Sequence, residues 1–216
     1  MVLRKKSILL IMVFLIGCFV CACGKEKSVV GETLVEDTKE VSSTEETKSV
    51  EEEAAEQWEK GYGLPVDEQE EKEAANDCKK MMELIFDIYK DADKGTASNV
   101  VLNDETVLEM QKQLMETGCP VATLVTYSNM ENYESVDSYL ENCAAGERGS
   151  VVVYEIHSDG GIGRIKYIYD GTDMYVVSAG SVWNKNGKSG MSYISYTRIK
   201  EWKYTDKGWF CYELCV

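Results

Sequence analysis

The residues best suited to chemistry surround His157, the only histidine of this 216-residue chain. Glu155 and Asp159 flank it two positions away on either side, and a histidine beside a carboxylate can act as a general base near neutral pH. A hydrolase or dehydratase centred on His157 is therefore one functional hypothesis. The competing interpretation is structural, because the local pattern puts His157 at the end of a strand on a charged, solvated sheet face.

Other groups of potential ligands lack the spacing that a metal or phosphate site needs. The sequence Asp91-x-Asp93-x-Gly95 is similar to the start of a calcium loop, but its glycine comes one position early and Leu102 stands where a bidentate carboxylate is required. The glycine-rich residues 160–163 join two predicted strands and open no helix, which indicates a hairpin loop. We expect no metal and no cofactor.

Cysteine is frequent, with eight residues in the chain. Five lie in the predicted folded part: Cys78, Cys119, Cys143, Cys211 and Cys215. They contain no C-x-x-C pair, so no zinc site is expected. Cys78 and Cys143 fall on apolar helix stripes, where a free thiol packs as a small hydrophobic group. Free thiols and one disulfide both remain open.

The first 24 residues carry information about location. Cations at residues 4–6 precede an apolar run over residues 8–20, which is too short to span a bilayer comfortably. This pattern, with a small residue before a cysteine, resembles a bacterial lipoprotein signal. The resemblance implies removal of residues 1–22 and lipidation of Cys23. Cys18 is the alternative acceptor, but apolar residues follow Cys18 whereas polar residues follow Cys23.

An acidic segment follows, and we predict a disordered tether over residues 23–72. Residues 24–77 hold eighteen acidic and six basic residues, a net charge of −12 out of −15 for the whole chain. Few large apolar groups offset the entropy of ordering this segment, and its charge excludes nucleic acid as a partner. Three large apolar residues interrupt it: Trp58, Tyr62 and Leu64. A short element that docks on the folded domain is therefore one interpretation of this stretch. A helix that begins at Glu68 is also compatible with the sequence.

Two helices are predicted next. Helical spacing of apolar residues indicates the first over about residues 78–92. The second begins near Asn103 or Asp104 and ends at Gly118. Its expected inward residues are Val107, Leu108, Met110 and Leu114.

A strand and a third helix complete this part of the chain. Residues 121–127 are rich in β-branched side chains, which favours a strand. Asn129 or Asn132 is the expected cap of the third helix, which Gly146 follows. The apolar stripe of that helix comprises Val136, Tyr139, Leu140 and Cys143.

From residue 150 onward the apolar pattern alternates, which predicts a five-stranded antiparallel meander. The first hairpin is expected to pair Ile156 with Ile165, Tyr154 with Tyr167, His157 with Arg164, and Glu155 with Lys166. The candidate pocket or charged face therefore consists of His157, Glu155, Arg164 and Lys166. The second hairpin, around residues 170–171, fits a two-residue or a three-residue loop. The many aromatic residues of the meander, Trp183 among them, either line a ligand groove or pack in the core.

The element order over roughly residues 70–216 resembles the cone-shaped fold of nuclear-transport-factor-like domains. Cystatin-like domains and the half-barrels of lipoprotein carriers share the theme of a helix against a curved sheet. The resemblance implies an α+β fold in which two to three helices pack on a curved antiparallel meander of five to six strands, with a pocket between them.

The whole chain also resembles uncharacterised lipoproteins of anaerobic Gram-positive bacteria. We expect a signal over residues 1–22, a tether over residues 23–72 and one α+β domain over residues 73–216, which is also compatible with the N-terminal part of a longer protein. The leading hypothesis is a lipid-anchored module on the extracytoplasmic side of the cell membrane. It would bind a protein, an envelope component or a small-molecule ligand without catalysing a reaction.

Overall fold

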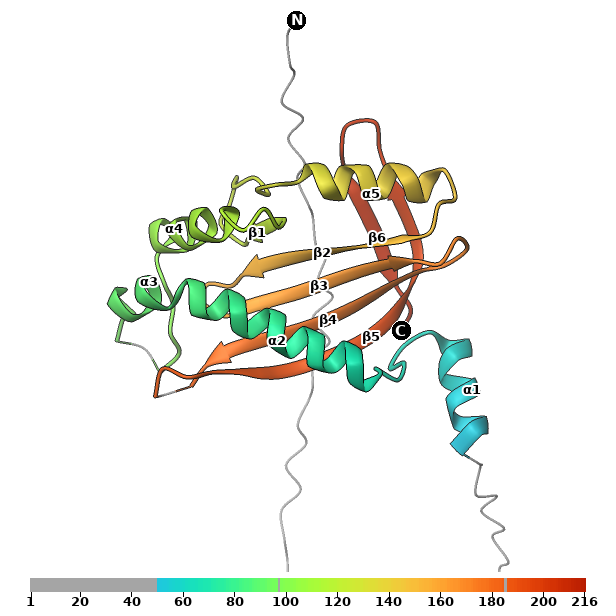
Figure 1. Ribbon diagram of the computed structural model, residues 1–216, viewed down its shortest axis with the longest axis horizontal. Helices are drawn as coiled ribbons and strands as arrows, with labels where there is room; N and C mark the ends of the chain where they lie inside the picture. The colour runs from blue at the N-terminus through green and yellow to red at the C-terminus, as the bar shows by residue number, and fades with distance from the viewer. Residues whose placement is uncertain (1–49, 97, 185) are drawn as a thin grey trace, which may run out of the picture.

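The computed structural model describes residues 50–216 except 97 and 185, and these residues form an α+β domain on one curled sheet (Figure 1). The strands are β1 (Val121–Thr123), β2 (Gly149–Ile156), β3 (Ile162–Tyr169), β4 (Met174–Trp183), β5 (Ser189–Tyr204) and β6 (Phe210–Leu214). They lie in sequence order, with β1 parallel to β2 and the other neighbours antiparallel. The helices are α1 (Val50–Lys60), α2 (Glu68–Leu84), α3 (Phe86–Asp91), α4 (Asp104–Met115) and α5 (Glu134–Ala144). The predicted fold class is confirmed.

The lipidation candidates Cys18 and Cys23 lie outside the described residues, as does the tether up to residue 49. The rest of the segment expected to be disordered holds α1 and the first turn of α2. Asp67 begins α2, because its Oδ1 accepts a hydrogen bond of 2.8 Å from the backbone N–H of Glu70. Acidic residues of α2 are ordered here because the sheet supplies cations that pair with them, which composition alone does not reveal.

The first predicted helix is divided in two at Ile85. This residue ends α2 and precedes α3, with a backbone (φ −101°, ψ 5°) that departs from helical geometry. Ile85 itself is fully buried, while the break leaves Phe86 38% exposed and Tyr89 only 7% exposed. Two aromatic residues of the short helix α3 therefore differ in burial, with Phe86 partly exposed and Tyr89 buried.

Helix α4 begins as predicted. The side chain of Asn103 accepts a hydrogen bond from the backbone N–H of Thr106 at 2.8 Å. Of the expected inward residues, Val107, Met110 and Leu114 are buried. Leu108 is 40% exposed, so its inward assignment is wrong. One position along a helix turns a side chain by about 100°, which carries Leu108 off the stripe that Val107 begins.

The predicted strand over residues 121–127 is shorter in the structure. Pairing with β2 stops at Thr123, and Tyr127 has a positive φ of 65° with 92% exposure. Asn132 does not cap α5: its amide donates to the carbonyl oxygens of Met115 and Cys119 at 2.8 and 2.9 Å. The apolar stripe of α5 is confirmed, because Val136, Tyr139, Leu140 and Cys143 are all buried.

The first hairpin has a different register from the predicted one. The observed pairs include Val152 with Lys166, Tyr154 with Arg164, Glu155 with Gly163, and Ile156 with Ile162. The loop is shorter than expected, since the backbone N–H of His157 donates to the carbonyl of Gly161 at 3.0 Å. In the second hairpin the backbone N–H of Asp170 donates to the carbonyl of Asp173 at 3.1 Å, which leaves Gly171 and Thr172 between the bonded residues, as in the two-residue alternative.

The changed register moves the expected apolar set onto two faces. Tyr154 and Ile156 pack with α2, α3 and α4, whereas Ile165 and Tyr167 pack with α5 on the opposite face. Helices cover both faces, so both strand faces are apolar, and alternation could not distinguish one register from another. The five cysteines of the described residues are free thiols, and Cys78 and Cys143 are buried.

Residues 61–64 join α1 to the sheet and are called here the seam. The backbone N–H of Leu64 donates to the carbonyl of Tyr196 at 3.0 Å, and that of Arg198 donates to the carbonyl of Gly61 at 2.6 Å. These bonds continue the pairing along the outer edge of β5 past the point where β6 ends. Cys215, the residue after β6, donates its N–H to the carbonyl of Arg198 at 3.0 Å. The chain therefore enters and leaves the domain at one place, beside α1 (Figure 1).

Candidate functional site

The four residues predicted to share a site lie on opposite faces of the sheet. Arg164 and Lys166 face α2, whereas Glu155 and His157 face the side that α5 covers in part. The register described above causes this separation, because β2 and β3 pair three positions away from the expected alignment. The charged face expected from the sequence therefore does not exist as one surface.

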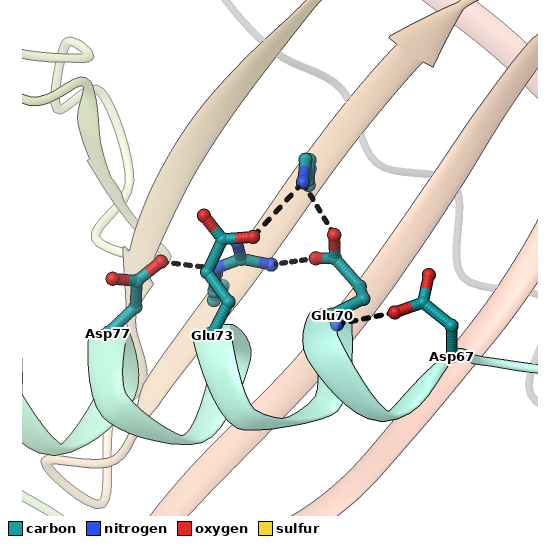
Figure 2. Close-up of polar contacts among 6 residues, drawn as sticks. Asp67, Glu70, Glu73 and Asp77 are labelled. Carbon is teal, nitrogen blue, oxygen red and sulfur yellow. Dashed lines mark hydrogen bonds and ion pairs between the residues drawn. The ribbon is translucent and has the colours of Figure 1, made fainter.

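Arg164 is the centre of an ionic network between α2 and β3. Its side chain is only 1% exposed, and its guanidinium contacts Glu70 and Asp77 at 2.8 Å each. Lys166 contacts Glu70 at 2.5 Å and Glu73 at 3.4 Å. Figure 2 shows Glu70, Glu73 and Asp77 projecting from one side of α2 toward these cations.

The electrostatics of Glu70 indicate that this network holds the helix on the sheet. Burial alone would raise the pKa of Glu70, but hydrogen bonds and charges from Lys166 and Arg164 outweigh it and lower the pKa below the ordinary value of 4.5. Both cations are saturated by carboxylates of the same chain. The network therefore has a structural role and offers little to a ligand.

His157 and Glu155 form a second polar pair. The His157 Nε2 lies 3.3 Å from the Glu155 Oε1, and their side chains are 30% and 11% exposed. The hydrogen bond and charge of Glu155 raise the pKa of His157 above 6.5, although burial acts against them. A Cβ on Gly163 would lie 3.0 Å from this Nε2, so the missing side chain makes room for the imidazole. The pair can exchange a proton, as general acid–base chemistry requires.

A pocket of about 670 Å³ lies beside α3, at the end of the domain opposite α1 (Figure 1). Its volume falls within the range of about 300–1,000 Å³ that is usual for small-molecule sites. Neither His157 nor Glu155 lines it. Four segments form its wall: α3, the loop before α4, the loop between β2 and β3, and the end of β4 with the loop that follows.

Three aromatic rings contribute apolar surface to the pocket. Trp183 stacks on Tyr89 with ring centroids 4.6 Å apart and an interplanar angle of 15°, and Phe86 lies 5.8 Å from Trp183. The indole Nε1 of Trp183 donates to the carbonyl of Gly160 at 2.9 Å, which fixes the ring. A Cβ on Gly160 would lie 2.7 Å from Tyr89 Cδ2, and its φ of +77° also favours glycine.

Charged groups border these rings. The ammonium of Lys94 lies 4.7 Å from the centroid of Tyr89 and donates to the carbonyls of Lys90 and Ala92 at 3.1 and 3.2 Å. One carboxylate oxygen of Asp159 accepts the N–H of Gly161 at 2.8 Å. The pKa of Tyr89 is raised by its burial and by the charge of Asp159. The pocket thus combines an aromatic floor with a polar rim.

The sequence patterns do not join these residues. Tyr89 falls within the helix predicted over residues 78–92, Trp183 is one of the aromatic residues of the meander, and Asp159 enters only as a neighbour of His157. One local signal was available: Trp183 ends its strand directly before the loop NKNGKSG, where a large aromatic has polar loop residues beside it. The break at Ile85, which brings Phe86 and Tyr89 to that loop, has no clear sequence signal.

Comparison with known proteins gives a family and no activity. The sequence profile of a family of unknown function, DUF6070, matches residues 71–216. Neither a curated protein nor a solved structure matches the chain. Within the part of the chain that the structure describes, no helix is long and apolar enough to cross a membrane, and no group of three metal-binding side chains occurs.

Proposed function

The chain belongs to the DUF6070 family of unknown function, and we propose that it is a membrane-tethered extracytoplasmic module that binds a small molecule without transforming it. The observation that carries this proposal is the pocket at the end of the sheet, where Phe86, Tyr89 and Trp183 meet under a polar rim. An apolar concavity with a few polar groups at its border is the usual form of a ligand site.

The position of the pocket suits a tethered protein. The chain enters the domain through α1 and the seam, while the pocket lies at the opposite end beside α3 (Figure 1). A lipid on Cys23 would attach the domain to the membrane through its α1 end and leave the pocket at the end away from the point of attachment. Two acyl chains suffice for stable anchoring, because each buried methylene contributes about 0.8 kcal/mol.

Fatty-acid labelling tests the anchor. Because the thiol itself is acylated, Cys23→Ser should abolish incorporation of a labelled fatty acid and leave residues 1–22 uncleaved. Cys18→Ser is the matched control and should retain both the label and the cleavage. Label that persists in Cys23→Ser and disappears in Cys18→Ser would move the anchor to Cys18, and label in neither wild type nor variants would refute lipidation.

Ligand-dependent stabilisation tests the pocket. The full-length protein in detergent is heated with a panel of sugars, nucleosides, amino acids, carboxylates and quaternary amines, since a ligand that binds only the folded state raises the unfolding temperature. Phe86→Ala should reduce the shift, whereas Tyr127→Ala, at another exposed aromatic, should retain it in full. A panel without any shift, or a shift that Phe86→Ala leaves unchanged, would refute binding in this pocket.

A hydrolase or dehydratase is the second candidate function. The contact between His157 and Glu155, with its raised histidine pKa, favours it. The two candidates differ in what His157→Ala does: it should leave ligand binding in the pocket unchanged if the protein is a binding module. Loss of turnover of a bound compound in His157→Ala would replace the binding module with an enzyme.

A further inference from the structure

We propose that the pocket beside α3 takes an uncharged saccharide, an inference that rests on the proposed binding function and names its ligand class. A sugar presents two kinds of surface, a face of C–H groups and a periphery of hydroxyls that both donate and accept hydrogen bonds. The pocket presents the complement of each surface, and its charges disfavour the two other ligand classes that an aromatic pocket commonly serves.

The first of these classes is the organic cation. Aromatic rings grouped around a site can bind a quaternary ammonium through the negative faces of their π systems. Here the protein's own ammonium has taken that position, because Lys94 Nζ lies 4.7 Å from the centroid of Tyr89. Trp183 stacks on the same tyrosine. A cationic ligand would therefore meet a fixed positive charge at the ring it needs.

The second class is the anion. Lys90 and Lys94 line the pocket, but Lys94 donates to the carbonyl oxygens of Lys90 and Ala92 at the end of α3. Those carbonyls carry the partial negative charge of a helix C-terminus and offset the ammonium. Asp159 adds a full negative charge to the same pocket. Among the described residues that line the pocket there is no arginine, the side chain best suited to hold a carboxylate or phosphate through two parallel hydrogen bonds.

The rim supplies groups suited to hydroxyls. Ser98, Asn99 and Asn186 line the pocket and are exposed, and each offers both a donor and an acceptor. Asn184 differs, because its Oδ1 accepts the backbone N–H groups of Asn186 and Lys188 at 2.8 and 3.1 Å. Its amide nitrogen is then the group available as a donor. Mixed donors and acceptors match a hydroxyl group, which is itself both.

The floor supplies the apolar surface. Trp183 already uses its indole N–H on the carbonyl of Gly160, so the ring contributes carbon surface and not a further donor. Phe86, at 38% exposure, stands beside it with a centroid distance of 5.8 Å. The ring of Trp183, held by its hydrogen bond to Gly160, offers a flat carbon surface on which the C–H face of a pyranose can pack with little loss of side-chain entropy. Phe86, tilted by 49° from it, adds a second apolar surface.

Titration calorimetry on the full-length protein in detergent tests the ligand class. The probes are mono- and disaccharides of hexoses, N-acetylhexosamines and deoxyhexoses, together with choline, benzoate and an N-acetylated amino-acid amide, each taken to tens of millimolar. We expect saccharides alone to bind. Phe86→Ala should weaken binding about tenfold, because it removes one of the two rings on which the sugar packs. Asn99→Ala should weaken it severalfold, and Asn142→Ala, an exposed asparagine of α5, should not change it.

The outcomes separate this inference from the proposed function. Binding of choline, benzoate or the amide that Phe86→Ala abolishes would overturn the saccharide inference and keep the binding module. Saccharide binding that neither Phe86→Ala nor Asn99→Ala weakens would place the sugar elsewhere and overturn the inference. Absence of binding by every probe, in a protein with a normal unfolding transition, would overturn both.

Discussion

Replacing Glu70 by glutamine should test how much the ionic network between α2 and β3 contributes to stability. Glu70 contacts Arg164 at 2.8 Å and Lys166 at 2.5 Å, and Arg164 is 1% exposed. Glutamine preserves the volume but removes the charge, which leaves Asp77 as the close partner of a buried guanidinium. Breaking a buried ion pair costs about 3–5 kcal/mol. Because Asp77 remains at 2.8 Å, we expect about 3 kcal/mol, a large share of the roughly 5–15 kcal/mol of a typical domain.

Urea unfolding at neutral pH, followed by tryptophan fluorescence, measures this loss. The matched control is Glu73→Gln on the same helix face, because Glu73 is 49% exposed and lies 3.4 Å from Lys166 and 4.0 Å from Arg164. An exposed pair of this kind contributes about 0–1 kcal/mol. Equal unfolding midpoints for Glu70→Gln and Glu73→Gln would show that the buried contacts add nothing beyond a surface pair.

The pH dependence provides a second criterion for the same pair of proteins. The folded-state pKa of Glu70 is lowered from 4.5, so its stabilising contribution is complete above 4.5 and is lost as the pH falls through the lowered value. The free-energy difference between wild type and Glu70→Gln should therefore shrink on acidification below pH 4.5. A difference that stays constant in that range would contradict the charge-based explanation and leave a packing effect.

Two further predictions concern the polar pair and the pocket. The imidazole NMR signals of His157, the only histidine, should titrate with a pKa above 6.5, and Glu155→Gln should lower that pKa. The stabilisation that the pair contributes should be complete below pH 6.5 and should be lost as the pH rises through the raised pKa of His157. Unchanged titration in Glu155→Gln would refute the contact. Gly160→Ala should lower the free energy of unfolding in urea by about 1–3 kcal/mol more than Gly118→Ala does. The two glycines have nearly the same φ, +77° and +76°, but only at Gly160 would the new Cβ meet a ring atom of Tyr89, at 2.7 Å. Equal costs would show that the ring yields freely.

The sequence predicted those features that depend on neighbouring residues. The stripe of α5 and the Asn103 cap follow from helical spacing and from local hydrogen bonding, and both occur. The register of β2 with β3 depends on which face of the sheet a distant helix covers. Because both faces are apolar, the alternation of residues does not distinguish one register from another. Arg164 is the clearest case. Its neighbours in sequence suggest a solvated strand face, yet its partners are Asp77 and Glu70, which lie 87 and 94 positions earlier in the chain.

The pocket was beyond sequence reasoning for the same reason. Its rings come from α3 and from the end of β4, and the pattern of the meander left both a ligand groove and a core position open for Trp183. Only the break at Ile85 and the bond from Trp183 to Gly160 bring them to one place. Proximity of this kind is a property of the folded chain, and no local pattern of residue types encodes it.

The seam brings the two ends of the described domain together, because Gly61 and Cys215 are hydrogen-bonded to the same residue of β5. Arg198 donates its backbone N–H to the carbonyl of Gly61 and accepts the N–H of Cys215 at its own carbonyl, both on the outer edge of β5, so the point of entry and the point of exit share one residue of β5. A short peptide could therefore join these two points, with a new opening placed in the loop between β5 and β6, and every strand neighbour would be preserved. The topology thus permits circular permutation, and it would also let the domain sit as an insert in a surface loop of another protein.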